Sequence, residues 1–232
     1  MPSLYFMLDS LLGFSTCLIH AFRREFGELQ EWVQELIVLS TENKFALYQA
    51  WGKMFLGRAQ VEHGEVEAGL DNLRQGLAEY QATGQKMSLS LLLLMFAEAY
   101  GESGQPEEGL QEIERALVFI EESGERFAEV EVLRVKGELL SQRHHQILED
   151  GEGGEIDLQV EECFRRAIEV AGEQGAKSWQ LRGVISLAHL LQRQSREAEA
   201  IALLEEITAW FTEGWDTVDM KEAQALLDTL RL

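Results

Sequence analysis

Apolar residues recur along the chain at spacings of three and four, and polar stretches rich in glycine interrupt them. This pattern predicts a succession of short amphipathic helices. It is clearest over residues 91–124, LLLLMFAEAYGESGQPEEGLQEIERALVFIEESG, which reads as two helices joined by a tight turn. A hairpin of this kind cannot bury its apolar face alone, so it predicts stacked neighbours.

The neighbours are marked by small residues at a regular interval. Consecutive small positions are separated by 40, 40, 40 and 51 residues, and they are Cys17, Gly57, Ala97, Gly137 and Ala188. Small residues let two helices cross closely, and bulky residues beside them fill the remaining space. The eleven extra residues in the last interval fit an insertion between the helices of one unit. The order of small and bulky positions resembles that of tetratricopeptide (TPR) repeats.

The predicted fold is therefore all-α: a right-handed superhelix of about five TPR-like helix-turn-helix repeats with a C-terminal capping helix. We expect one solenoid over residues 1–232. Its units cover about 4–40, 42–84, 86–124, 126–175 (with an inserted loop over 144–154) and 177–213, and the cap covers 217–232. Asp219 and Glu222 resemble a capping pair at the start of the last helix.

The net charge of the chain limits the classes of molecule that we expect it to bind. The chain has 41 acidic and 20 basic residues, a formal net charge of −21. Nucleic acids and anionic membrane surfaces require basic clusters, so we expect neither as a partner. The apolar start, Met1–Ile19, lacks a basic segment and contains Asp9, which is not typical of a signal peptide. Two cysteines in distant units suit a reducing environment, so the expected location is the cytoplasm.

Several segments resemble one bacterial protein family. They are AEAYGESGQPEEGL, RVKGELL, CFRRAIEVAGEQGAKSWQLR, SLAHLLQRQ and WFTEGWDTVDMKEAQALL. Together they are similar to the C-terminal TPR region of multidomain proteins that combine a class III adenylate/guanylate cyclase with a signal-transduction ATPase. The resemblance covers nearly the whole chain and is weakest before Glu42. It implies a sensor or regulatory arm that binds a partner, and it brings no catalytic residues.

TPR arrays bind partners on the concave face, which is lined by outward positions of each first helix. The predicted partner-binding residues are Trp51, Met54, Arg58, Leu94, Glu98, Arg134, Glu138, Arg182 and His189. Three arginines on one face of so acidic a chain suggest a peptide with an apolar anchor and a carboxylate, which arginine can bind through two parallel hydrogen bonds. The alternative is that the arginines pair with Glu98, Glu131 and Glu138 of the chain itself.

The inserted loop contains residue types that bind metals, but in the wrong arrangement. Its candidates are His144, His145, Glu149 and Asp150. A calcium loop starting at Asp150 requires glycine at its sixth position, where this chain has Glu155. Phosphate-binding, zinc-protease and nucleophile-elbow motifs are missing from the sequence. We therefore expect no metal, no cofactor and no enzymatic activity.

Two further expectations concern the ends of the array. Trp210, Phe211 and Trp215 are predicted to form a hydrophobic plug between the last hairpin and its cap. The apolar first helix suggests either a piece of a longer protein or a self-capped free-standing chain.

The predicted function is a non-catalytic protein- or peptide-binding scaffold in bacterial signalling. An oligomerisation module and a small-molecule sensor pocket inside the superhelix remain as alternatives, and the oligomeric state stays open.

Overall fold

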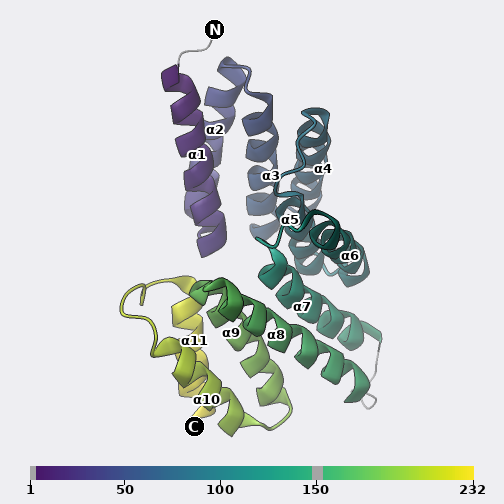
Figure 1. Cartoon of the computed structure of the whole chain (residues 1–232), viewed down its shortest axis with the longest axis vertical. Coiled ribbons are helices and arrows are strands. Elements are labelled where there is room, and N and C mark those ends of the chain that lie inside the picture. The colour runs from purple at the N-terminus through teal and green to yellow at the C-terminus, as the bar shows by residue number, and fades with distance from the viewer. Residues whose placement is uncertain (1–3, 148–153) are drawn as a thin grey trace.

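The computed structural model describes residues 4–147 and 154–232. Within these ranges the regular structure is helical, and the prediction of an all-α repeat array is confirmed. The helices, shown in Figure 1, are α1 (Leu4–Arg23), α2 (Phe26–Glu42), α3 (Ala46–Glu62), α4 (Val66–Ala82), α5 (Leu89–Glu102), α6 (Pro106–Ser123), α7 (Glu129–Ile147), α8 (Gly154–Gln174), α9 (Lys177–Arg193), α10 (Glu197–Thr208) and α11 (Val218–Leu230).

The helices form two layers. Each odd-numbered helix from α1 to α9 packs against the even-numbered helix that follows it, which gives five hairpins. The odd-numbered helices also pack against one another in order, α1 with α3, α3 with α5, α5 with α7 and α7 with α9. They form the inner layer, while α11 packs against α9 and α10 at the end of the array.

Small residues at the helix crossings explain the sequence period. A Cβ atom added to Gly57 of α3 would lie 2.5 Å from the carbonyl oxygen of Gly69 in α4. In the last hairpin Ala188 and Ala200 are completely buried. Glycine or alanine at these positions allows the backbones to approach, so the repeated small residue reflects helix packing.

The hydrophobic core comprises three clusters of buried residues: a large N-terminal one, a C-terminal one and a small one between α7 and α8. In its N-terminal part the side chains of Phe14, Trp51 and Phe55 pack together, and the ring centroids of Phe14 and Trp51 are 5.1 Å apart. Leucines and alanines of α9, α10 and α11 dominate the C-terminal part. Trp51 and Met54, expected on the groove, belong to this core and are 5% and 0% exposed. Phe14 of α1 packs against Trp51, and Met54 lies against Gly76 of α4.

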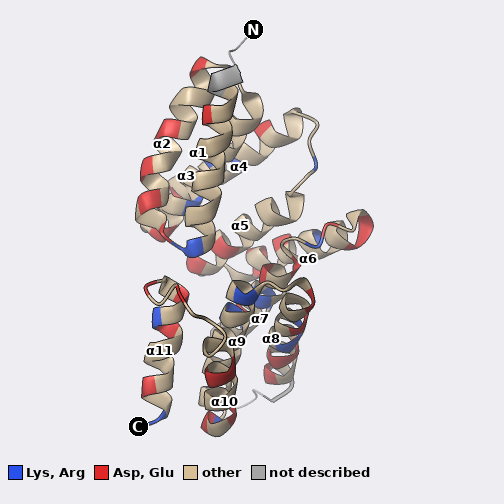
Figure 2. Ribbon diagram, turned by 60° about the vertical axis from the view of Figure 1, so that its left-hand side comes forward, with Lys and Arg blue, Asp and Glu red and all other residues tan. Residues whose placement is uncertain are grey.

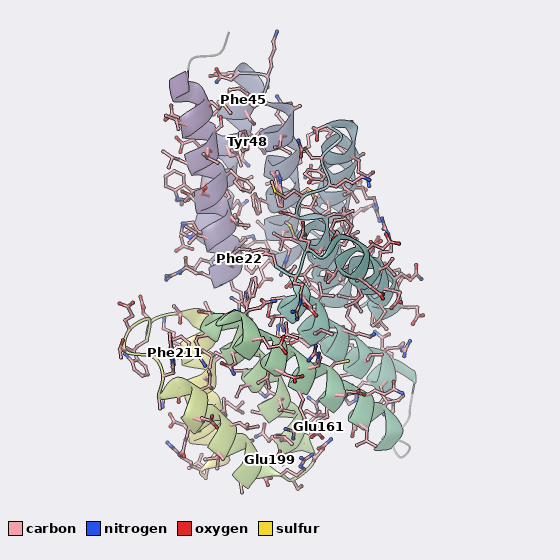
Figure 3. The ribbon with its side chains drawn as sticks, in the orientation of Figure 1. Phe22, Phe45, Tyr48, Glu161, Glu199 and Phe211 are labelled. Carbon is pink, nitrogen blue, oxygen red and sulfur yellow. The ribbon has the colours of Figure 1, made fainter. Side chains whose placement is uncertain are left out.

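The array curves until its first and last parts touch. Figures 1 and 3 show the C-terminal end of α1, where Phe22 lies, next to the C-terminal half of the chain. The ring centroid of Phe22 lies 5.7 Å from that of Phe127 and 5.6 Å from that of Trp179. We call this meeting of the α1–α2 corner with α9 and α11 the end-to-end contact.

Two sequence-based expectations require correction. Helix α7 continues through His144 and His145 to Ile147, so both histidines are helical rather than part of a loop. Glu149 and Asp150 lie outside the described residues. Among the residues that are described, no group of three or more His, Cys, Asp and Glu side chains could hold a metal ion.

The prediction of a tryptophan plug was wrong. Helix α10 ends at Thr208, and the following segment carries Trp210 and Trp215 to the surface, where they are 58% and 53% exposed. Phe211 is half-buried against the C-terminal core. Leu204, Ile207 and Met220 instead fill the space between the last hairpin and α11. No helix in the described part of the chain combines the length and hydrophobicity of a membrane span.

Candidate binding groove

The inner layer encloses one large cavity. Its volume is about 620 Å³, and residues from α1, α3, α5, α7 and α9 line it, with Glu222 of α11 at one side. The walls combine apolar side chains, among them Phe55, Leu94 and Val135, with a series of arginines and glutamates. We refer to this cavity as the groove.

The first charged cluster in the groove is centred on Arg58 of α3. Its guanidinium binds both carboxylate oxygens of Glu102, at 2.9 Å (Nη1 to Oε2) and 2.5 Å (Nη2 to Oε1). Glu62 and Glu98 each accept a longer bond of 3.4 Å from the same guanidinium. The Phe26 ring covers the guanidinium, with its centroid 4.5 Å from Arg58 Cζ. We call Arg58, Glu62, Glu98 and Glu102 the Arg58 lobe.

The second cluster lies at the end-to-end contact. Arg182 of α9 donates through Nε to Asp219 Oδ2 at 2.8 Å and through Nη1 to Glu131 Oε2 at 3.3 Å. It also donates to the backbone carbonyl of Phe22. Arg24 reaches Glu222 at 2.9 Å and Asp219 at 3.3 Å. The bond from Arg182 to Phe22 and the two bonds from Arg24 join residues 160 to 198 positions apart. We call Arg24, Glu131, Arg182, Asp219 and Glu222 the clasp.

Arg134 of α7 connects the two clusters. It donates to both carboxylate oxygens of Glu131 at 3.0 Å and to Glu138 at 2.5 Å. On the other side its guanidinium lies 3.9 Å from Glu98 in the Arg58 lobe. The predicted alternative, in which the arginines pair with glutamates of the chain, therefore describes the bonds that the structure contains.

Three arginines of the groove are more buried than most of their glutamate partners. The side chains of Arg58, Arg134 and Arg182 are only 7%, 12% and 9% exposed. Their partners at the groove surface are more open: Glu62 is 40% exposed, Glu98 26%, Glu102 35% and Glu138 39%. Around Arg58 and Arg134 an incoming molecule thus meets carboxylate oxygens rather than guanidinium groups, whereas Arg24, 44% exposed, presents its guanidinium at the clasp.

The pKa values follow this arrangement. Burial raises the pKa of Glu102 to about 7, and repulsion by Glu62 and Glu98 adds to the rise, although Arg58 opposes it. In the clasp, burial alone would raise the pKa of Glu131, but Arg134 and Arg182 outweigh burial and lower it. The nearby His189 ring and the hydrogen bond from Arg24 lower the pKa of Glu222 to about 2, against the opposing effect of burial.

The predicted binding residues fall into three groups. Six line the groove: Arg58, Leu94, Glu98, Arg134, Glu138 and Arg182. His189 lies at its edge, partly exposed, with Nε2 3.8 Å from Glu222. Trp51 and Met54 lie in the core and do not line the groove.

Sequence reasoning named Glu98, Glu131 and Glu138 as partners of the arginines but missed Glu62, Glu102 and the contact of Arg24 with α11. Glu62 follows Arg58 by four positions, and Glu102 follows Glu98 by four, so helical spacing could have placed both glutamates on the inner face. No local signal joins Arg24 to Asp219, because that contact depends on the curvature of the whole array.

Comparison with solved structures places the chain among TPR-like repeat folds. A Podosopora anserina protein of the kinesin light chain type, built from nearly identical TPR-like repeats, superposes with a TM-score of 0.55 at 16% identity, covering 90% of this chain and 96% of that one. A variant of that protein gives 0.54 at 16% identity, with 85% and 92% covered. Yeast Tom70 gives 0.57 at 13% identity, covering 96% of this chain and 40% of Tom70.

These similarities confirm the predicted TPR-like fold. No protein-family model matches the chain, and neither does any curated protein sequence. At such low identity the shared feature is the fold alone.

Proposed function

We propose that the chain is a non-catalytic scaffold that binds a protein or peptide partner in the groove. The observation that carries this proposal is the cavity of about 620 Å³ on the inner layer, to which every hairpin contributes. Concave pockets with apolar walls and a few placed polar groups are the usual form of a binding site. The groove has both features.

Signalling is the proposed context. The sequence resembles the TPR region that accompanies a nucleotide cyclase and a signal-transduction ATPase in bacterial proteins, so we infer a cytoplasmic sensor or regulatory arm. A ligand can regulate an attached domain only through different affinities for two conformations. We propose the end-to-end contact as the element that changes: a ligand in the groove would favour either the closed clasp of this structure or an opened one.

The test is selection of peptides from a random phage-displayed library on the intact chain. Binding of the selected peptides is then measured on two tryptophan variants, Ser186→Trp in the groove and Gln111→Trp on the exposed face of α6. We expect Ser186→Trp to abolish binding because the indole occupies the cavity, and Gln111→Trp to leave binding unchanged. Gln142→Trp, at a more exposed groove position, serves as a second blocking variant.

Equal binding by the wild-type chain and both groove variants would contradict the proposal, provided that circular dichroism shows that the variants are folded. So would a selection that yields no binding peptide. Either result would indicate that a partner binds on the outer helices instead.

A small-molecule sensor is a second candidate. The cavity volume lies within the range of roughly 300–1,000 Å³ that is usual for small-molecule pockets, and the end-to-end contact closes the array around it. Native mass spectrometry of the purified chain decides this case. A reproducible extra mass, released on denaturation, favours a small molecule, and the bare chain mass counts against it.

An oligomerisation module is a third candidate, favoured by the outer surface of α1. Figure 2 shows this helix with few charged residues. Five of its apolar side chains are 44% to 64% exposed: Met7, Leu8, Leu11, Leu12 and Ile19. If this surface joins two copies, Leu8→Glu with Leu12→Glu should convert a dimer to a monomer in light scattering. A monomeric wild-type chain at high concentration would count against the idea.

A further inference from the structure

The Arg58 lobe carries more negative charge than its own arginine can balance. One guanidinium faces three carboxylates, those of Glu62, Glu98 and Glu102. The nearest further cation, Arg134, is 3.9 Å from Glu98 and is already bound to Glu131 and Glu138. At neutral pH the lobe therefore has an excess of negative charge inside a partly closed cavity.

Hydrogen-bonding capacity shows the same imbalance. Arginine has five N–H donors, and Arg58 uses its donors in four bonds to the three glutamates. It is also covered by Phe26 and by the protein around it. The carboxylates, by contrast, remain 26% to 40% exposed and keep unused acceptor positions. A ligand at this point must supply donors and positive charge.

We propose that the Arg58 lobe is the specificity site of the groove and binds a lysine or arginine side chain of the partner peptide. This inference rests on the proposed function, and it replaces the expectation of an acidic ligand. A carboxylate here would approach three carboxylates, while four of the five guanidinium donors are already used.

The surrounding apolar residues suit a long basic side chain. Phe55, Val61, Leu94 and Val66 line the cavity near the lobe. Lysine and arginine place their methylene groups along apolar surface and keep the charged end with polar partners. The site therefore suits a basic side chain whose methylene groups lie on apolar surface, rather than a basic side chain that stays in solvent.

Binding of a cation should also release protons. The pKa of Glu102 is about 7 in the free chain, so a large share of this carboxyl is protonated at pH 7. Arg58 and Glu62 of α3, Glu98 of α5 and Arg134 of α7 are the charged groups around it. A bound cation favours the ionised form, so affinity should rise as pH increases towards 7 and level off above it.

The test uses peptides selected from the random library, at about 0.15 M salt so that long-range attraction to the acidic chain is screened. Each selected peptide is titrated by calorimetry in its native form and in an acetylated form, in which lysines are acetylated and arginines are replaced by neutral citrulline. The protein variant is Glu62→Gln with Glu102→Gln. The matched control is Glu114→Gln with Glu121→Gln, which changes the net charge equally on the exposed face of α6.

We expect acetylation and the groove double variant each to weaken binding by about tenfold or more, since a hydrogen bond to a charged group is lost. The control variant should bind as the wild type does. Titrations at pH 7 in buffers of different ionisation enthalpy should show proton release that disappears in the groove variant.

Two results would overturn the inference and leave the proposed function intact. One is groove-dependent binding of peptides without basic residues, or of the acetylated forms at full affinity. The other is equal weakening by the control double variant, which would indicate non-specific charge attraction. A selection without any groove-dependent peptide would overturn both the inference and the proposed function.

Discussion

The clasp and the Arg58 lobe are built from arginine and carboxylate side chains, but they differ in the balance of positive and negative charge and in how exposed the charged side chains are. In the clasp, the side chains of Arg182 and Glu131 are 9% and 4% exposed, and each charge has partners of opposite sign at hydrogen-bonding distance. In the lobe, one buried arginine faces three partly exposed glutamates. Paired and buried charges define which helices meet, whereas unbalanced and accessible charges are available to a ligand.

The largest expected effect comes from Arg182→Ala in the clasp. The substitution leaves Glu131 and Asp219 buried with less compensating charge. Removing one partner of a buried ion pair typically costs about 3–5 kcal/mol of unfolding free energy. Urea denaturation measures the loss. Arg115→Ala is the control, because its ion pair with Glu112 lies at the surface, and it should cost less than about 1 kcal/mol. Equal losses would contradict the structural role of the clasp.

A second prediction compares two glutamate-to-glutamine changes. Glu131→Gln removes the carboxylate shared by Arg134 and Arg182, and it should cost about 1–3 kcal/mol because buried donors lose a charged acceptor. Glu102→Gln relieves repulsion with Glu62 and Glu98, so we expect a smaller change. The comparison fails if Glu102→Gln destabilises the chain more than Glu131→Gln does.

The two clusters should also respond to pH with opposite signs. Glu222 has a pKa of about 2 in the folded chain, below its ordinary value of 4.5, so its stabilising effect is present above pH 4.5 and is lost as pH falls towards 2. Glu102 has a folded pKa of about 7, so the folded chain retains a proton that the unfolded chain loses. Its effect on stability therefore declines as pH rises from 4.5 to 7.

Urea denaturation between pH 2.5 and 8 measures both effects in wild-type, Glu102→Gln and Glu222→Gln chains. Glu102→Gln should remove the decline in unfolding free energy between pH 4.5 and 7. Glu222→Gln should reduce the loss of unfolding free energy at acid pH. Identical profiles for the wild-type and variant chains would show that neither carboxyl is perturbed.

The smallest expected effect is that of Arg24→Gln. Arg24 is 44% exposed, so its pairs with Asp219 and Glu222 should contribute no more than about 1 kcal/mol. The pKa of Glu222 should nevertheless rise towards 4.5, because the hydrogen bond from Arg24 that helps to lower it is removed. A carboxyl NMR titration detects the rise, and an unchanged pKa would place Arg24 outside the clasp.

The helical repeat was predictable because it depends on local pattern. Small residues such as Gly57, Ala97 and Ala188 recur at nearly constant spacing, because the two helices of each hairpin must cross closely at that point. Helix ends were less predictable. Helix α10 stops at Thr208, inside the predicted unit 177–213, and Trp210, predicted to be buried, is therefore exposed. The sequence does not show how the next segment leaves the array.

The groove was predictable only in part, because it depends on long-range curvature. Repeat position placed Arg58, Arg134 and Arg182 on the inner face, and they lie there. The same rule placed Trp51 on the groove, but α1 covers it with Phe14. The contact of Arg24 with Glu222, 198 positions away, arises from the curvature of all five hairpins and has no local signal.

The most direct test of groove binding is hydrogen–deuterium exchange of the intact chain with and without a selected peptide. The account predicts slower exchange in α3, α5 and α7, centred on residues 58–62 and 98–102, and little change in α2, α4 and α6. Protection confined to α2, α4 and α6, with α3, α5 and α7 unaffected, would contradict the claim that the inner layer is the binding surface.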